Sequence, residues 1–315
     1  MATMTDSFGK ALMESGKNEK LVVINADLSN STRTSYFASS YPERFFNVGI
    51  AEQDEFSMAA GLAIAGKIPV ASTYAIFASR GWEQIRNTIS RANLNVKIFA
   101  THAGLTDFGD GSSHQALEDI ALFRALPNFS VLAPSDPRQT SILTERASES
   151  KGPVYARLAR GETESIYSTE DFAIGKPNII EDGKDVSIFA CGLMVPKAIE
   201  ARRMLKKDGV DAGVIDFHTI KPLDEKTVER AAKTGAIVTA EEHSVIGGLG
   251  SAIAECLAKK SPCPVEMVGI KDEFGTSGSL EELYEHFGLT GKHIANASKR
   301  ALGRKDTKRK FWLGR

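Results

Sequence analysis

Two histidines and an aspartate stand in or beside one glycine-rich stretch, and side chains of these types can move protons. His102 precedes the stretch, Asp110 lies between two glycines, and His114 ends it. Because imidazole titrates near neutral pH, His114 is suited to shuttling a proton. The spacing of the three residues matches no standard set of metal ligands. Histidines buried in a core are the plainer interpretation, although loops at strand ends more often carry function.

A glutamate at the start of an apolar helical pattern is a second candidate. Glu52 directly follows Gly49-Ile50-Ala51. Taken alone, a carboxylate at a helix N-terminus is explained by its favourable interaction with the helix dipole. Further along the chain, Ser72–Arg80 contains the aromatic residues Tyr74 and Phe77, but its composition is also that of ordinary core. A structural and a functional interpretation are therefore both open for these residues.

The elements that position these residues alternate regularly. Short β-branched runs begin at Leu21, Ile68, Val96 and Ser130. Helical patterns cover residues 52–65, 81–92, 115–124 and 137–150. This alternation predicts a parallel sheet with helices on both faces, in which ligands bind beyond the carboxyl ends of the strands. The residues that follow predicted strands, and that we expect at one rim, are Asp27, Thr73, Tyr74, Phe77, His102, Ser135 and Asp136.

A second α/β alternation follows a polar, turn-rich stretch. Residues 163–184 lack a sustained period and are predicted to be an interdomain linker. The expected organisation is two doubly wound α/β domains, residues 1–162 and 185–315. The second domain offers a thinner set of polar residues at its predicted strand ends, namely Asp216, His218, Glu241, Glu242 and His243.

The composition is that of an ordinary globular protein. Of 315 residues, 42% are hydrophobic, and 39 Lys plus Arg balance 40 Asp plus Glu. This balance points to neither nucleic acid nor an anionic membrane as a partner. The three cysteines are too few and too scattered for a disulfide framework or a metal cluster. With no secretory pattern at the N-terminus and no apolar run of membrane-spanning length, a cytoplasmic location is expected.

The string Phe46–Gln53 resembles the glutamate motif of the pyrimidine-binding domain in transketolases and 1-deoxyxylulose-5-phosphate synthases. The resemblance implies a thiamine diphosphate cofactor, with Glu52 as the carboxyl group that hydrogen-bonds N1′ of the aminopyrimidine. It also implies that Phe77 stacks on the aminopyrimidine, that Tyr74 forms a second wall and that Asp27 supports the site. Transketolases often have an aromatic residue where this chain has Arg80, whereas the synthases tend to have arginine, so the role of Arg80 is open.

The stretch Thr101–Glu118 resembles the transketolase loop that ends in a His-Gln pair. The resemblance implies that His102 and His114 contact the sugar phosphate and its reacting oxygens and that Asp110 binds a substrate hydroxyl. It further implies that Ser31 and Arg160 bind the substrate phosphate, and guanidinium suits phosphate through bidentate bonding.

One departure concerns the start of the chain. Transketolases usually carry another phosphate-binding arginine just before the first helix, and Met4–Ser7 contains none. This departure puts ordinary affinity for pentose phosphates in question.

The second half resembles the transketolase C-terminal domain, most clearly in His218–Asp224 and Glu241–His243. Gly247–Gly250 follows these strings and is interpreted as a tight turn, with anion binding as the alternative. Full-length members also carry an N-terminal domain that binds diphosphate and Mg²⁺ through a Gly-Asp-Gly motif. Gly109–Gly111 lies inside the substrate loop and has no suitable asparagine after it, so we treat that match as coincidental.

The resemblance therefore implies a separate N-terminal subunit. That subunit is expected to supply the diphosphate and Mg²⁺ site, with no metal ligands in this chain. An α2β2 assembly is the economical symmetric arrangement.

The predicted function is that of the C-terminal subunit of a transketolase, which transfers a two-carbon ketol unit between sugar phosphates. Half of a 1-deoxyxylulose-5-phosphate synthase-like enzyme is one alternative. The beta subunit of a 2-oxoacid dehydrogenase is another, but its glutamate motif is not usually followed by glutamine, and the histidine loop fits it poorly. A non-catalytic scaffold or regulatory subunit is a third alternative, against which stands the set Glu52, Phe77 and His114.

Overall fold

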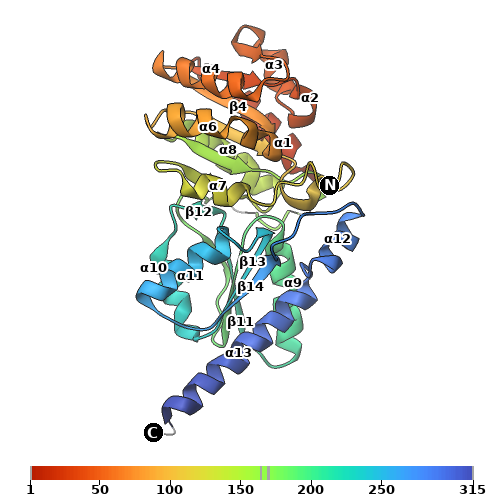
Figure 1. Cartoon of the computed structure of the whole chain (residues 1–315), viewed down its shortest axis with the longest axis vertical. Coiled ribbons are helices and arrows are strands. Elements are labelled where there is room, and N and C mark those ends of the chain that lie inside the picture. Colours follow the sequence, from red (N-terminus) through yellow and green to blue (C-terminus); the bar gives the residue numbers. More distant parts are fainter. Residues whose placement is uncertain (1, 164, 169–170, 314–315) are drawn as a thin grey trace.

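The computed structural model describes residues 2–163, 165–168 and 171–313, and only the backbone of residues 2, 162 and 306–313. Two α/β domains stack along the long axis of the molecule (Figure 1). The predicted fold class, two α/β domains with mainly parallel sheets, is confirmed. Among the described residues, no helix is both long and apolar enough to cross a membrane.

The first domain contains the larger sheet, with strand order β12-β6-β7-β5-β4-β2-β3. Its strands are β2 (Leu21–Asn25), β3 (Phe45–Asn47), β4 (Ile68–Tyr74), β5 (Lys97–Thr101), β6 (Ser130–Leu132), β7 (Val154–Arg157) and β12 (Thr219–Lys221). All neighbours pair in parallel except β12, which runs antiparallel to β6. The carboxyl ends of the parallel strands therefore share one edge, as the alternating pattern predicts.

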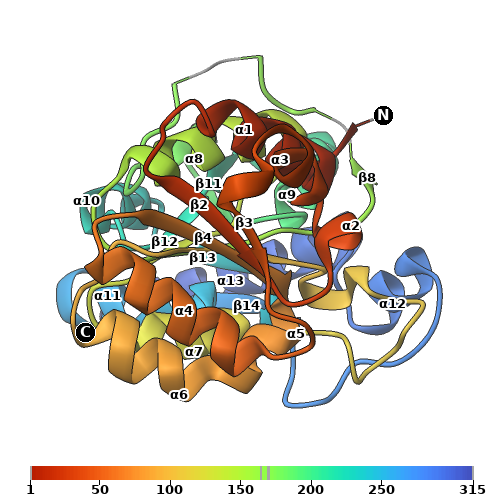
Figure 2. The same cartoon turned by 90° about the horizontal axis from the view of Figure 1, so that it is seen from above.

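Helices cover both faces of this sheet (Figure 2). One face carries α1 (Met4–Ser15), α3 (Ser35–Ser40) and α8 (Pro137–Glu149). The other carries α4 (Glu52–Ile64), α6 (Trp82–Gln84) with its π-helical continuation η3 (Ile85–Ser90), and α7 (Asp119–Ala125). The short helices α2 (Ser29–Thr32) and α5 (Ala75–Ala78) follow β2 and β4.

The helix predicted from residue 115 begins four residues later than expected. Gln115 donates its side-chain amide to the Thr276 carbonyl oxygen, 2.9 Å away, in the other domain. The segment before Asp119 is therefore committed to a tertiary contact and does not form the first helical turn.

The second domain has five strands in the order β14-β13-β10-β11-β9. They are β9 (Asn178–Glu181), β10 (Val186–Ala190), β11 (Ala212–Asp216), β13 (Ile237–Ser244) and β14 (Val265–Ile270). The helices are α9 (Met194–Lys207), α10 (Glu225–Ala231), α11 (Leu249–Lys260), α12 (Leu280–His286) and α13 (Gly291–Leu313).

Part of the predicted linker forms strands. Residues 178–181 are β9, the antiparallel edge of the second sheet, and β8 (Glu162–Thr163) pairs with β1 (Ala2–Thr3). Residues 164 and 169–170 of the predicted linker lie outside the described residues. Such short polar edge strands carry too little hydrophobic periodicity to be recognised without their partners.

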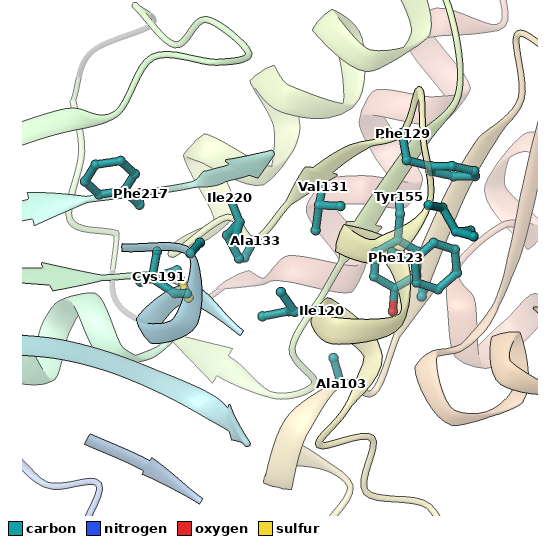
Figure 3. Packing of buried hydrophobic residues seen from close by; sticks show 14 of the residues in the cluster. Ala103, Ile120, Phe123, Phe129, Val131, Ala133, Tyr155, Cys191, Phe217 and Ile220 are labelled. Atoms are coloured by element: carbon teal, nitrogen blue, oxygen red, sulfur yellow. The ribbon is translucent and has the colours of Figure 1, made fainter. Parts of the chain in front are cut away.

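The domains also share a strand and a core. β12 comes from the second half of the chain but extends the sheet of the first domain. Figure 3 shows Phe217, Ile220 and Cys191 in one buried cluster with Val131 and Phe123 of the first domain. A continuous apolar contact of this kind favours a fixed arrangement of the two domains.

Candidate active site

Hydrogen bonds link the segment before α4 to the segment that follows β2. Asp27, two residues after the end of β2, has φ +63°, and its backbone N–H donates to Asn47 Oδ1 at 3.1 Å. Asn47 returns a hydrogen bond from its side-chain amide to Asp27 Oδ1 at 3.1 Å and accepts one from the Gly49 N–H at 3.0 Å. Asp27 thus helps to hold, through Asn47, the turn that leads into Glu52.

Glu52 is nearly buried at the start of α4 and faces one cation. Its side chain is 5% exposed, and Arg80 Nε donates to Glu52 Oε2 at 3.0 Å. Arg80 itself is 67% exposed, so its guanidinium can leave for solvent without breaking the core. The structure places Arg80 as the counter-charge of Glu52, a role that sequence comparison left open.

One turn further along α4, Glu55 is a buried carboxyl group that sequence analysis did not identify. Neither of its oxygens has a hydrogen-bond partner at good geometry among the described residues. Burial raises the pKa of Glu55 to about 8; the nearby Ser72 backbone opposes this shift and the charge of Glu52 adds to it. Glu55 therefore holds its proton at neutral pH. The available signal was an acidic residue on the same face as Glu52, three positions later.

Four rings form an aromatic wall after β4 and β5. Tyr74 stacks on His102 with ring centroids 3.8 Å apart and on Phe77 with centroids 5.5 Å apart. His114 meets Phe77 edge-on at 5.4 Å. The wall joins residues of the predicted cofactor pocket to both histidines of the predicted substrate loop, although the two groups are far apart in sequence.

His102 is a neutral hydrogen-bonding group in this arrangement. It adopts φ +58° and is 5% exposed, with Nδ1 2.8 Å from Thr101 Oγ1. Burial lowers its pKa to about 4, and the positive charge of Arg160 contributes to the shift. His102 therefore cannot supply a positive charge to a bound anion near neutral pH.

The structure distinguishes the two arginines of the strand Val154–Arg157 and its extension. Arg157 is buried in an ion pair with Asp119 at 2.9 Å, which removes it from ligand binding. Arg160 is about half exposed, and its Nη1 donates to Asp107 Oδ1 at 2.8 Å. Asp107 is fully buried and was not identified from the sequence, because its partner lies 53 positions away.

The remaining predicted residues lie around this group. Asp110 is exposed on the loop before His114, and Ser31 is half-buried in α2. Gly111, next to Asp110, has φ +78° and lies against Ser277 of the second domain, so the substrate loop rests on that domain. Within the described part of the chain, no three His, Cys, Asp or Glu side chains gather as a metal site.

For the glycine-rich loop after β13, the structure favours a tight turn over a site for an anionic ligand. The backbone N–H groups of Leu249 and Gly250, at the start of α11, both donate to the Glu241 carboxylate, at 2.6 and 2.8 Å. The helix N-terminus does bind an anion, but that anion is a buried side chain of the same domain.

Comparisons with known proteins agree with this geometry. Residues 1–165 match the model of the transketolase pyrimidine-binding domain, and residues 175–294 match that of the transketolase C-terminal domain. A putative transketolase C-terminal section from Methanocaldococcus jannaschii is 48% identical over 93% of this chain and 94% of its own length. A 6-deoxy-6-sulfo-D-fructose transketolase subunit from a Clostridium species is 40% identical over 96% and 95%.

A solved structure gives the same result in three dimensions. It is described as a split-gene transketolase, an inactive beta4 tetramer, and it is 48% identical to this chain. The two structures superpose with a TM-score of 0.89, covering 97% of this chain and 100% of that one.

Proposed function

Because this chain belongs to the transketolase family, we propose that it is the subunit of a two-chain transketolase that activates thiamine diphosphate and binds the sugar. The reaction we propose is transfer of a two-carbon ketol unit between sugar phosphates. The diphosphate and Mg²⁺ are held by a separate N-terminal subunit. A pyrimidine-binding domain implies the cofactor, and relatives named as sections or subunits imply the partner.

The residues of the rim fit an aminopyrimidine ring. Glu52 offers a nearly buried carboxyl group, and its one ionic partner, Arg80, is free to withdraw. Phe77 and Tyr74 offer half-buried aromatic surface, with their rings stacked on one another. Thr73 Oγ1, in β4 just before Tyr74, is buried without a hydrogen-bond partner in the described residues, so it is able to bind a further polar group. When bound, thiamine diphosphate supplies the carbon nucleophile and the electron sink of the reaction.

The chain's own residues then bind and orient. Glu52 holds or releases a proton at the pyrimidine N1′, and a water-poor environment strengthens that bond. Neutral His102 and the nearby His114 donate or accept hydrogen bonds at the reacting oxygens, and His114 carries the proton. Asp110 accepts a hydrogen bond from a substrate hydroxyl group. Arg160, held by Asp107, binds the terminal phosphate.

The observation that carries this proposal is the placement of Glu52. Glu52 is a carboxyl that is 5% exposed at the start of α4, and it is paired with Arg80, three residues after Phe77 of the aromatic wall. It has no evident structural function of its own. Its ion pair with an exposed arginine is of the kind that contributes about 0–1 kcal/mol, too little to explain the arrangement by stability.

The test is reconstitution with the N-terminal subunit. We expect the purified chain alone to give no turnover, and co-expression with the subunit that carries the diphosphate domain to give ketol transfer from hydroxypyruvate to an aldose phosphate. Thiamine diphosphate binding is measured in parallel by circular dichroism. Robust activity of the single chain would contradict the proposal that it needs a separate N-terminal subunit. Carbon dioxide release with pyruvate as donor, and none with hydroxypyruvate, would favour the synthase alternative.

A further inference from the structure

Arg33 lies at the substrate rim and has no role in the family motifs. It follows α2, the short helix that carries Ser31, and it adopts φ +64°. This left-handed conformation is uncommon for a residue with a side chain and costs on the order of 1 kcal/mol. Gly9 permits the arrangement, since a Cβ there would lie 2.6 Å from Arg33 Cβ.

The guanidinium of Arg33 is held at the start of α1. Arg33 Nε donates to Asp6 Oδ1 at 2.7 Å, and Tyr36 donates its hydroxyl to the same oxygen at 2.9 Å. Thr3 Oγ1 donates to Asp6 Oδ2 at 2.7 Å and accepts a bond from the Asp6 N–H. In the family, a phosphate-binding arginine usually precedes the first helix, and this chain has none there. The guanidinium of Arg33, from another element, lies beside that segment instead.

The same segment is joined to Arg160. Thr3 pairs with Glu162 across β1 and β8, only two residues beyond Arg160. Both guanidinium charges act on His102, where they add to the lowering of its pKa. Figure 2 shows α2 and the loop after β5 at the same edge of the sheet. Arg33 and Arg160 therefore both lie close enough to His102 for their charges to act on it.

A gain in folding stability does not explain why Arg33 is held against Asp6. The Arg33–Asp6 pair is 39% and 30% exposed, and such pairs contribute about 0–1 kcal/mol, no more than the left-handed backbone costs. The second terminal nitrogen, Nη2, makes no hydrogen bond to any residue that the structure describes, whereas Nη1 donates to the Asn30 carbonyl. A guanidinium that is fixed by one carboxylate and keeps Nη2 as a free hydrogen-bond donor is suited to binding a tetrahedral anion.

We propose that Arg33, held by Asp6, is the second anion-binding arginine of the substrate site and acts with Arg160 on the terminal phosphate or sulfonate of the sugar. This assignment rests on the proposed transketolase function. It supplies from α2 the positive charge that the first helix lacks, and it makes Arg33 a specificity-determining residue for anionic over neutral sugars.

The test compares acceptors with and without the anion, in the holoenzyme reconstituted with the N-terminal subunit. With hydroxypyruvate as donor, Arg33→Gln is expected to raise the KM for ribose 5-phosphate about 10- to 100-fold, the effect of one charge-assisted bond. We expect the kinetic constants for unphosphorylated ribose to stay within about twofold. Arg33→Lys, which keeps the charge, should lie between the variant and the wild type.

Controls separate binding from folding and phosphate from sulfonate. Arg230→Gln removes a half-exposed arginine of the second domain, 3.5 Å from Asp182, and should change neither KM. Inorganic phosphate and methanesulfonate are compared as competitive inhibitors, and the stronger one identifies the anion. Arg33→Gln should weaken inhibition by that anion.

Two outcomes would overturn the assignment of Arg33 while leaving the proposed function intact. One is an unchanged KM for ribose 5-phosphate in Arg33→Gln, and the other is an equal loss with both acceptors. If the wild-type complex transfers a ketol unit to neither acceptor, the proposed function itself fails.

Discussion

The two domains use the carboxyl ends of their strands in opposite ways. In the first domain, Asp27 and His102 follow strands in left-handed conformations, and His102 stacks on the half-buried ring of Tyr74. In the second, acidic residues on or at the ends of the strands are taken up by hydrogen bonds within the protein, as Glu241 is by the start of α11. Asp216 Oδ2 alone accepts hydrogen bonds from Ser135 Oγ, Gln139 Nε2 and Tyr167 Oη, at 3.1, 2.9 and 2.7 Å.

Glu242 of the second domain helps to hold the first. Glu242 Oε1 accepts the backbone N–H of Leu105 at 2.7 Å, three residues after His102. Gly104 lies so close to Glu242 that a Cβ there would be 2.7 Å from its carboxyl carbon. The same topological position thus forms a candidate active site in one domain and a support for that site in the other. A polar residue at a strand end is informative only once its hydrogen-bond partners are known.

Glu52 and Glu242 are buried carboxyls that this comparison assigns to opposite roles. Glu52→Ala in the reconstituted complex is expected to reduce kcat by at least about 10²-fold, since loss of a proton-handling group costs about 10²–10⁴-fold. The two subunits should still co-purify, and the free energy of unfolding should change little, because the one ion pair of Glu52 is to Arg80, whose side chain is 67% exposed. Undiminished turnover would remove Glu52 from the active site.

Glu242→Ala should show the reverse pattern. The variant leaves the buried Leu105 N–H without its acceptor, which costs about 1–3 kcal/mol of unfolding free energy. The measurement is the midpoint of urea unfolding at an unchanged m value, with Glu52→Ala as the matched control. Because Glu242 supports the substrate loop and handles no proton, we expect kcat to stay within a few-fold of wild type. A loss of turnover as large as that of Glu52→Ala would erase the distinction between the domains.

The buried Glu55 of the first domain is expected to make the free energy of unfolding depend on pH. Its pKa is about 8 in the folded chain against 4.5 for an ordinary glutamate. The folded state therefore keeps a proton that the unfolded state releases, so this contribution to stability is complete below pH 4.5 and is lost as pH rises through 8.

Glu55→Gln should make the decline of stability between about pH 5 and 8 shallower, by up to about 1 kcal/mol per pH unit. The check is a series of urea midpoints across that range for the wild type and the variant. Parallel curves would mean that Glu55 is not the group that titrates.

The sequence by itself determined the class of fold and the rim on which the candidate residues lie. Alternating β-branched and helical runs are local, so they place Asp27, Tyr74 and His102 after strands whose carboxyl ends share one edge. The motif around Glu52 is likewise contiguous, which is why it could be recognised without coordinates.

Only the tertiary structure decided which of these groups are paired. It buried Arg157 against Asp119 and left Arg160 at the rim, held by Asp107. It brought Arg33 to Asp6, 27 positions away, and moved β12 into the sheet of the other domain. Each of these outcomes depends on contacts between segments far apart in the chain. Periodicity and composition describe the neighbours of a residue in sequence and carry no information on its neighbours in space.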